Sequence, residues 1–298
     1  MLKVESVTKK YGNLTAVDNL SFTVNDGCIF GLLGLNGAGK TTTFRMILGL
    51  LDDYTGNITI DNEHINYKIS DKIGFLTEER SLLTKMTVHD QIIYYGVLKS
   101  LSESVIEKRL DYWLERFGIT EYKNRKIKEL SKGNQQKVQF ISSIINEPKL
   151  LILDEPFSGL DPINVELFKS VILELKKKGT SIIFSSHRME HVELFCEELV
   201  VLVKGKSVLQ GKLSEIKKNY KKKNIYVIGD INPEEIKKIT GVLDISKEGE
   251  EYIISVESMD YVSKIFKSIA KYDNILKFSV EDPSLNEIFI SIVGANYE

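Results

Sequence analysis

One stretch of the chain combines glycines, a lysine and hydroxyl side chains at a spacing that suits phosphate binding. Residues 34–42 read Gly-Leu-Asn-Gly-Ala-Gly-Lys-Thr-Thr, which fits the pattern G-x-x-x-x-G-K-[ST] at every fixed position. Glycines let the backbone bend around an anion and aim several N–H groups at it. The pattern therefore predicts a loop that binds a nucleoside triphosphate. Its expected contacts come from Asn36, Gly37, Ala38, Gly39, Lys40, Thr41 and Thr42.

Two side chains of this loop have separate expected tasks. Lys40 supplies a positive charge for the β- and γ-phosphates, and the hydroxyl of Thr41 is a ligand for Mg²⁺. The apolar residues 29–33 just before the loop predict a buried parallel strand, and apolar residues at helical spacing follow it. This strand-to-helix setting favours phosphate binding over a glycine-rich turn that binds nothing, because the helix N-terminus adds its dipole.

Two acidic residues follow a second apolar run. Residues 149–156 read Lys-Leu-Leu-Ile-Leu-Asp-Glu-Pro, which predicts a buried parallel strand that ends in Asp154 and Glu155. Ligands of open α/β sheets sit at this end of the strands, and a buried carboxylate needs a cation nearby. Asp154 therefore suits the acid that organises Mg²⁺, and Glu155 is placed to polarise an attacking water. His187 follows another predicted strand, residues 181–185, and is a candidate for the same site.

Other polar residues are typical of helix starts and turns. Ser131 lies in Leu-Ser-Lys-Gly-Asn, residues 130–134, before a helix with apolar residues on one face. Taken alone, a polar helix start is the simpler interpretation of that stretch. Asp161, followed by a proline, is the expected cap of another helix. Tyr11 lies in a polar turn beside Gly12, and it is either a surface aromatic or a ring that stacks on a nucleobase.

The predicted elements divide the chain into an α/β domain, residues 1–218, and a small α+β domain, residues 219–298. Within the first, residues from about 85 to 145 are mainly helical and form an insert between strands. The lysine-rich, apolar-poor residues 217–224 mark the boundary. Beyond them the elements follow the order β-α-β-β-α-β of a ferredoxin-like fold, and a last helix closes the chain.

Composition argues against several classes of protein. The chain of 298 residues has a net charge of −2, which gives no reason to expect a nucleic-acid partner. No run of 18 apolar residues occurs, and the N-terminus lacks a signal-peptide core. The two cysteines, Cys28 and Cys196, are isolated, so a disulfide is not expected and the cytoplasm is the natural compartment.

The phosphate loop, the stretch 130–138, the strand at 150–156 and His187 occur in an order that resembles the ATP-binding subunit of an ABC transporter. The resemblance covers about residues 1–215 and implies a phosphate-loop ATPase domain with a helical subdomain. It is strongest with bacterial exporters of the sodium- and drug-efflux type, some of which carry a C-terminal accessory domain. Residues 281–289 resemble the closing helix of that domain.

The resemblance implies roles that the residues alone leave open. Tyr11 would stack on adenine, and His187 would be the switch histidine that contacts the γ-phosphate. Ser131 and Gly133 belong to the stretch that matches the ABC signature, and they would reach the γ-phosphate by a hydroxyl and by the backbone. Asp161 ends the stretch Phe-Ser-Gly-Leu-Asp, which matches the family's D-loop.

Three features depart from the family's usual pattern. Glu78 stands where most relatives have the glutamine of the Q-loop, and a related group of exporters also has Glu-Glu-Arg there. Glu78 is therefore still expected to hold a water or Mg²⁺. Lys132 and Asn134 replace the third and fifth signature residues, and Leu35 replaces a proline that mainly shapes the phosphate loop.

The resemblance implies an enzyme that hydrolyses ATP with Mg²⁺ and powers a separate membrane permease, for export of an ion, drug or peptide. ATP would join two such subunits, as a homodimer or heterodimer, at the cytoplasmic face of the membrane. Two other classes of protein account for fewer of these sequence features. Soluble ABC proteins that act on ribosomes or DNA usually carry two such units or long coiled coils. A phosphate-loop kinase or GTPase would leave the signature, the D-loop and His187 unexplained.

Overall fold

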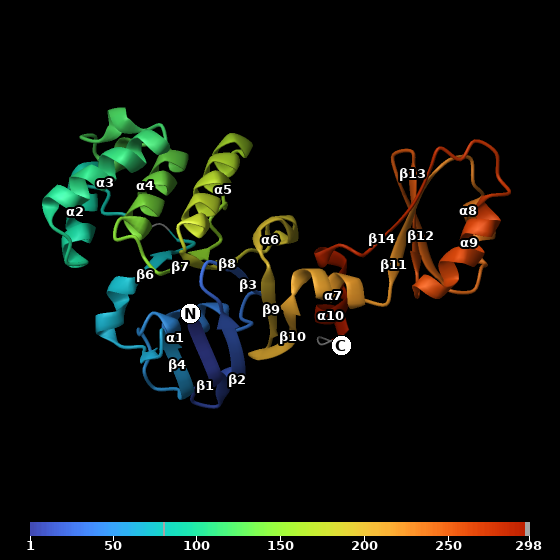
Figure 1. The fold of residues 1–298 in the computed structure, drawn as a ribbon, viewed down its shortest axis with the longest axis horizontal. Coiled ribbons are helices and arrows are strands. Elements are labelled where there is room, and N and C mark those ends of the chain that lie inside the picture. Colours follow the sequence, from blue (N-terminus) through green and yellow to red (C-terminus); the bar gives the residue numbers. More distant parts are fainter. Residues whose placement is uncertain (80, 296–298) are drawn as a thin grey trace. The chain divides into compact units, whose positions relative to one another are not determined.

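The computed structural model describes residues 1–79 and 81–295, so Arg80 of the Glu-Glu-Arg stretch lies outside it. The chain divides into two compact units, Met1–Gln210 and Gly211–Glu298 (Figure 1). This division lies before the predicted boundary at residue 218, because helix α7 (Leu213–Asn219) groups with the second unit. This short helix is hard to predict from the sequence, since its lysines dilute the apolar pattern.

The first unit is built on a six-stranded sheet of order β10-β9-β3-β8-β7-β6. Strand β3 pairs in parallel with β8 and β9, and β7 pairs in parallel with β6 and β8. Strands β3, β7 and β8 are buried along almost their whole length, as strands covered on both faces must be. The strands are β3 (Ile29–Gly34), β6 (Ile73–Leu76), β7 (Leu150–Asp154), β8 (Ser181–Ser185), β9 (Glu198–Val203) and β10 (Lys206–Lys212).

An antiparallel sheet of order β2-β1-β4-β5 shares a core with the first sheet. Phe22 of β2 stacks on Phe30 of β3 with ring centroids 5.1 Å apart. Tyr11, which is predicted to lie in a turn, is instead the last residue of β1 and pairs with Leu14. Pairing continues to the strand end because Gly12, at φ +57°, permits a tight turn. The strands are β1 (Leu2–Tyr11), β2 (Leu14–Val24), β4 (Thr55–Ile60) and β5 (Glu63–His64).

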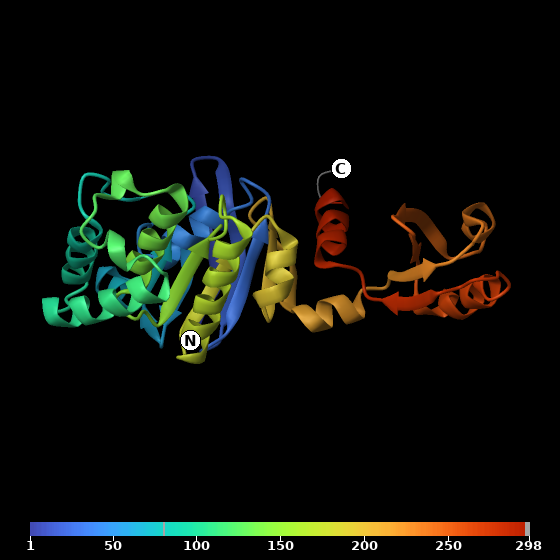
Figure 2. The ribbon, with the colours of Figure 1, turned by 90° about the horizontal axis from the view of Figure 1, so that it is seen from above.

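A group of helices, green in Figures 1 and 2, lies at one end of the first unit. It contains α2 (Val88–Leu98), α3 (Glu103–Arg116) and α4 (Lys132–Ile144), within the part of the chain predicted to be helical. The rings of Phe117 and Phe140 meet edge to face, with centroids 5.7 Å apart, so aromatic side chains fill the core of this group. The remaining helices of the unit are α1 (Lys40–Ile47), α5 (Pro162–Lys177) and α6 (Met189–Phe195).

The second unit has the ferredoxin-like order that the sequence predicts. Its sheet runs β12-β13-β11-β14, with every neighbouring pair antiparallel, and helices α8 and α9 cover one face (Figure 1). The elements are β11 (Lys223–Ile228), α8 (Pro233–Lys237), β12 (Val242–Glu248), β13 (Glu251–Val256), α9 (Val262–Ile269), β14 (Lys277–Glu281) and α10 (Leu285–Ala295). Across residues 1–79 and 81–295, no helix is both long and apolar enough to cross a bilayer.

Candidate functional site

The phosphate loop connects β3 to α1, and its glycines are required by its geometry. Gly34 has φ +151°, and a Cβ there would lie 2.5 Å from the carbonyl oxygen of Leu202. Gly39, the N-cap of α1, has φ +108°, and a Cβ there would lie 2.6 Å from the carbonyl oxygen of Ala16. Neighbouring backbone therefore approaches both positions too closely for any side chain. The N-terminus of α1 opens at the end of this loop, where its dipole favours an anion.

The ammonium group of Lys40 lies over the loop. Its Nζ donates to the carbonyl oxygens of Gly34, at 2.6 Å, and Leu35, at 3.2 Å. Burial lowers the pKa of Lys40, and three nearby carboxylates oppose this shift. These carboxylates belong to Asp154, Glu155 and Glu78. One cation and three acids, which come from three separate stretches of the chain, thus lie close enough beside the phosphate loop for their charges to interact.

Asp154 ends β7 and is the acid best suited to a metal ion. The hydroxyl of Ser185, its register partner on β8, donates to Asp154 Oδ1. Burial raises the pKa of Asp154, whereas Ser185 and Lys40 lower it. A desolvated carboxylate beside a phosphate loop fits Mg²⁺, which binds one or two carboxylates together with phosphate oxygens and water. The hydroxyl of Thr41 at the start of α1 adds a further oxygen ligand of the required kind.

Glu155 lies next in the chain in a strained conformation, with φ +50° and only 8% of the residue exposed. Its Oε1 accepts from the backbone N–H of His187 at 2.6 Å, and the ring Nδ1 of His187 lies 2.9 Å from Oε2. Burial raises the pKa of Glu155, and the contacts with His187 oppose that shift. A carboxylate held in this way is a more effective proton acceptor than an exposed glutamate.

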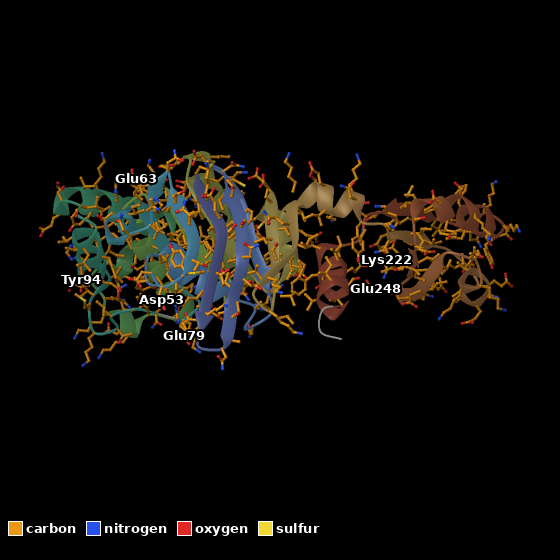
Figure 3. All side chains as sticks on the ribbon, turned by 90° about the horizontal axis from the view of Figure 1, so that it is seen from below. Asp53, Glu63, Glu79, Tyr94, Lys222 and Glu248 are labelled. Atoms are coloured by element: carbon orange, nitrogen blue, oxygen red, sulfur yellow. The ribbon has the colours of Figure 1, made fainter. Side chains whose placement is uncertain are left out.

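Tyr11 is half-exposed and is supported by a residue that sequence reasoning missed. The residue is 44% exposed, and the Nζ of Lys9 lies 4.7 Å from the ring centroid of Tyr11. Lys9 is 1% exposed, and its ammonium group bonds to the carboxylate and the backbone oxygen of Asp53, which is labelled in Figure 3. The sequence does contain a sign of this contact, because residues two apart in a strand, such as Lys9 and Tyr11, lie on the same face.

Ser131, Gly133 and Asp161 form a constellation of their own. The Ser131 hydroxyl accepts from the N–H of Asn134 at 3.3 Å, and an Asp161 oxygen accepts from the N–H of Asn164 at 2.9 Å. Both predicted helix caps are thereby confirmed. A Cβ on Gly133 would lie 3.5 Å from the side-chain nitrogen of Asn164, so the starts of α4 and α5 are neighbours. Asp161 is not among the carboxylates that act on Lys40.

A parallel sheet, a phosphate loop at a strand-to-helix turn and two desolvated acids, Asp154 and Glu155, at the end of β7 define a phosphate-loop ATPase. The family described as ABC transporter matches residues 17–158. The family described as ATP-binding protein DrrA1-3-like, C-terminal domain, matches residues 211–293. The first match falls within the first unit, and the second match falls within the second unit.

Known relatives extend these matches to the whole chain. The chain is 51% identical over 298 residues to an uncharacterized ABC transporter ATP-binding protein, YhaQ of Bacillus subtilis, with both chains fully covered. It is 30% identical over 306 residues to the linearmycin resistance ATP-binding protein LnrL of Bacillus subtilis, covering 99% of this chain and 98% of that one. A solved ATP-binding subunit of an ABC transporter matches with a TM-score of 0.70 and 30% identity, over 74% of this chain and 93% of that one.

The chain therefore belongs to the ATP-binding proteins of ABC transporters. Members of this family bind and hydrolyse ATP, so the protein is an ATPase that powers a membrane permease. ATP-binding subunits of this kind dimerise and work with permease partners. The fold class, the enzyme class and the general function predicted from the sequence are confirmed.

Proposed function

We propose that this chain is a peripheral ATPase subunit on the cytoplasmic face of the membrane, where two such subunits drive an export permease. The observation that carries this proposal is the division of the site residues into two constellations. Lys40 and the acids form one, and the adjoining starts of α4 and α5 form the other. Each half surrounds an anion on one side, so a complete ATP site needs the halves of two chains.

In the proposed site, the phosphates lie in the loop formed by residues 36–42. Lys40 leaves the carbonyls of Gly34 and Leu35 and bonds to the phosphates, which are stronger acceptors. Thr41, Asp154 and Glu78 would hold Mg²⁺. Bound Mg²⁺ neutralises charge on the β- and γ-phosphates.

Glu155 acts on the water that attacks the γ-phosphate, and His187 positions Glu155. The short bond from the His187 N–H fixes Oε1 of Glu155, and Oε2, which the His187 ring contacts in this structure, becomes available to orient water or accept its proton once that ring turns away. The His187 ring is 71% exposed, so it can turn toward a bound γ-phosphate. Tyr11 presents a ring face to adenine, with Lys9 holding the ring in place.

The partner's Ser131 and Gly133 complete the site from the opposite side, and Asp161 lies at the interface between the two subunits. The hydroxyl of Ser131 and the start of helix α4 would donate to the γ-phosphate of the other chain. ATP thereby holds two subunits together, and hydrolysis separates them. Homodimers and heterodimers are both compatible with this arrangement.

The surface proposed for the permease lies beside the Glu78 loop. A pocket of about 270 Å³ lies between β6 and the helical group, and Ser81, Leu82 and Tyr95 contribute to its lining. Nearby on α2, Tyr94 and Leu98 are 46% and 59% exposed, and Figure 3 labels Tyr94 at the edge of the helical group. Exposed apolar side chains around a pocket are typical of a protein interface. No nucleic-acid partner is proposed, because the net charge of −2 offers no electrostatic attraction.

Mixing two inactive variants tests the shared site. Lys40→Ala removes the phosphate lysine, and Ser131→Arg blocks closure with a bulky side chain, so each homodimer should be inactive. A heterodimer has one site with both lesions and one with neither. ATP hydrolysis should therefore recover partly, with a maximum near equal amounts of the two variants.

The permease is included in this assay if the isolated subunit turns over slowly. Crosslinking establishes that heterodimers are present. Persistent inactivity of such a mixture would contradict a site in which one intact half from each chain is sufficient. Co-purification of the wild-type chain with a multi-span membrane protein separately tests the permease partner.

A further inference from the structure

One buried side chain holds the loop around Glu78 on both sides. Gln139 of α4 is 4% exposed. Its amide nitrogen lies 3.1 Å from the carbonyl oxygen of Thr77, 3.0 Å from the Thr77 hydroxyl and 3.2 Å from the carbonyl oxygen of Glu79. The two N–H groups of one amide thus serve three acceptors on the residues that flank Glu78. Glu79 is labelled in Figure 3.

A second buried amide holds the far end of the same segment. Gln91 of α2 is fully buried, and its Oε1 accepts from the N–H of Leu83 at 2.7 Å. Its Nε2 donates to the hydroxyl of Ser142 on α4 at 3.2 Å. Hydrogen bonds therefore connect both Thr77 and Leu83 to the helical group. The bond to Thr77 comes directly from α4, and the bond to Leu83 comes from Gln91, which also bonds to α4.

Helix α4 also carries the signature residues. Ser131 caps it, and Gly133 lies in its first turn, roughly 9 Å along the helix axis from Gln139 at 1.5 Å per residue. A helix of this length moves as a rigid body because its backbone hydrogen bonds are internal. Any shift of its N-terminus toward a ligand therefore moves the amide that holds the Glu78 loop.

Packing alone does not explain a glutamine at position 139. Among the residues that the structure describes, Gln139 Oε1 is a buried oxygen without a hydrogen-bond partner. Leaving an acceptor unpaired in the interior costs free energy, and an apolar side chain of similar volume would avoid that cost. The amide is useful here for its donors, which bond only to the Glu78 loop among the hydrogen bonds described for this side chain.

We propose that Gln139 is a positioning residue that sets the place of Glu78 in the ATP site of its own chain. Through α4, Gln139 couples the position of Glu78 to the position of Ser131 and Gly133 at the start of that helix, which face the ATP of the partner in the proposed dimer. The inference rests on the proposed two-subunit function. It predicts that loss of the amide uncouples the two sites and slows turnover while each chain still binds ATP.

The test uses the full-length chain and three variants. Gln139→Met keeps the side-chain volume and removes the three bonds. Gln139→Glu replaces the donors with a carboxylate that faces oxygen acceptors. Ser143→Ala is the matched control, because its buried hydroxyl lies on the same helix and donates to the carbonyl of Phe140 within that helix.

We expect Gln139→Met to lower kcat about tenfold while the Kd for ATP changes less than about twofold. The dependence of rate on ATP concentration should also become less steep. For Gln139→Glu, the deficit in kcat relative to wild type should shrink as the pH falls, because the protonated acid regains one donor. The deficit of Gln139→Met should not change with pH in this way. Ser143→Ala should match wild type in kcat, Kd and steepness.

Wild-type kcat in both Gln139 variants would overturn the proposal. It would also fail if the Gln139 variants and Ser143→Ala lost kcat, ATP affinity and thermal stability together, because a general packing defect would then explain the loss. Hydrolysis by the wild-type chain in the same assay reports on the proposed function itself, so the two failures are distinguishable.

Discussion

At the scale of single residues, the charge at the phosphate loop comes from Lys40. The other donors near the loop are neutral N–H groups and hydroxyls, whose bonds to phosphate are weaker than those of an ammonium group. Three carboxylates act on this lysine, so its positive charge also balances the acids around it. Removal of Lys40 would leave these acids to repel the phosphates of ATP.

Lys40→Ala should therefore abolish hydrolysis and weaken ATP binding. The expected loss in kcat is about 10²-fold or more, as for removal of one strong donor from a transition-state site. Initial rates at saturating Mg-ATP measure it, and Lys108→Ala, an exposed lysine on α3, is the control. Unchanged turnover at saturating Mg-ATP would show that this loop does not bind the reacting phosphates.

Glu155→Gln should retain ATP binding and stop turnover, because an amide cannot accept a proton from the attacking water. Slow hydrolysis should then trap the ATP-bound dimer. Size-exclusion chromatography with Mg-ATP is the measurement, with and without the nucleotide. A monomer at every concentration, with the phosphate loop intact, would count against the dimer.

The pH dependence of kcat should also report Glu155. A general base acts only when it is deprotonated, and burial raises the pKa of Glu155 above that of an ordinary glutamate. Activity should therefore be lost, as pH falls, at a higher pH than an exposed glutamate would give. The His187 side chain lowers the pKa of Glu155, so His187→Ala should move this loss to still higher pH. A shift in the opposite direction in a pH–rate profile would contradict the assignment.

At the scale of elements, the segment after β6 links the ATP site to the proposed permease surface. The negative charge of Glu78 raises the pKa of both Lys40 and Asp154. Ser81 and Leu82 of the same segment line the pocket beside α2. A short segment that touches both places can transmit a change from one to the other.

Glu78→Ala should reduce permease-stimulated hydrolysis more than it reduces ATP affinity. The reason is that Lys40 and the loop N–H groups still bind the phosphates, whereas the link to the permease surface is lost. Titration of a labelled ATP analogue and hydrolysis with and without permease give the two quantities, and Glu79→Ala is the neighbouring control. Equal losses in both would indicate that Glu78 is only a nucleotide ligand.

At the scale of the whole molecule, the two units have separate cores. Apolar residues of the two sheets and α1 form the core of the first unit, and residues of β11, β13, α8 and α9 form that of the second. Both the phosphate loop and the signature lie in the first unit. The ATPase machinery therefore does not depend on the ferredoxin-like sheet for its side chains.

A chain that ends at Lys212, which keeps β10 intact, should fold and bind ATP with an affinity within about twofold of the full chain. The proposed role of the removed unit, in dimer contact or regulation, would appear as a changed dimerisation constant or a changed response to the permease. Circular dichroism and ATP titration provide the measurement. Insolubility of the shortened chain would mean that the two units depend on each other to fold.

Features that arise within a few residues of chain can be predicted from the amino-acid sequence. The phosphate loop, the caps at Ser131 and Asp161, and the apolar run before Asp154 are recognisable because their bonds and periodicity are local. The ferredoxin-like order followed from alternating strands and helices in the same way. These local signals were enough to predict the class of fold and the family's ATP chemistry.

Contacts between side chains that are distant in the sequence are visible only in the folded chain. Ser185 contacts Asp154 across 31 positions of the chain, and Gln139 reaches Thr77 across 62 positions. A buried lysine beneath Tyr11 likewise depends on Asp53 from another part of the chain. Such contacts leave no periodic trace, because they depend on which strands and helices become neighbours when apolar surface is buried. The neighbouring starts of α4 and α5 have the same origin, since the packing of these helices places Gly133 beside Asn164.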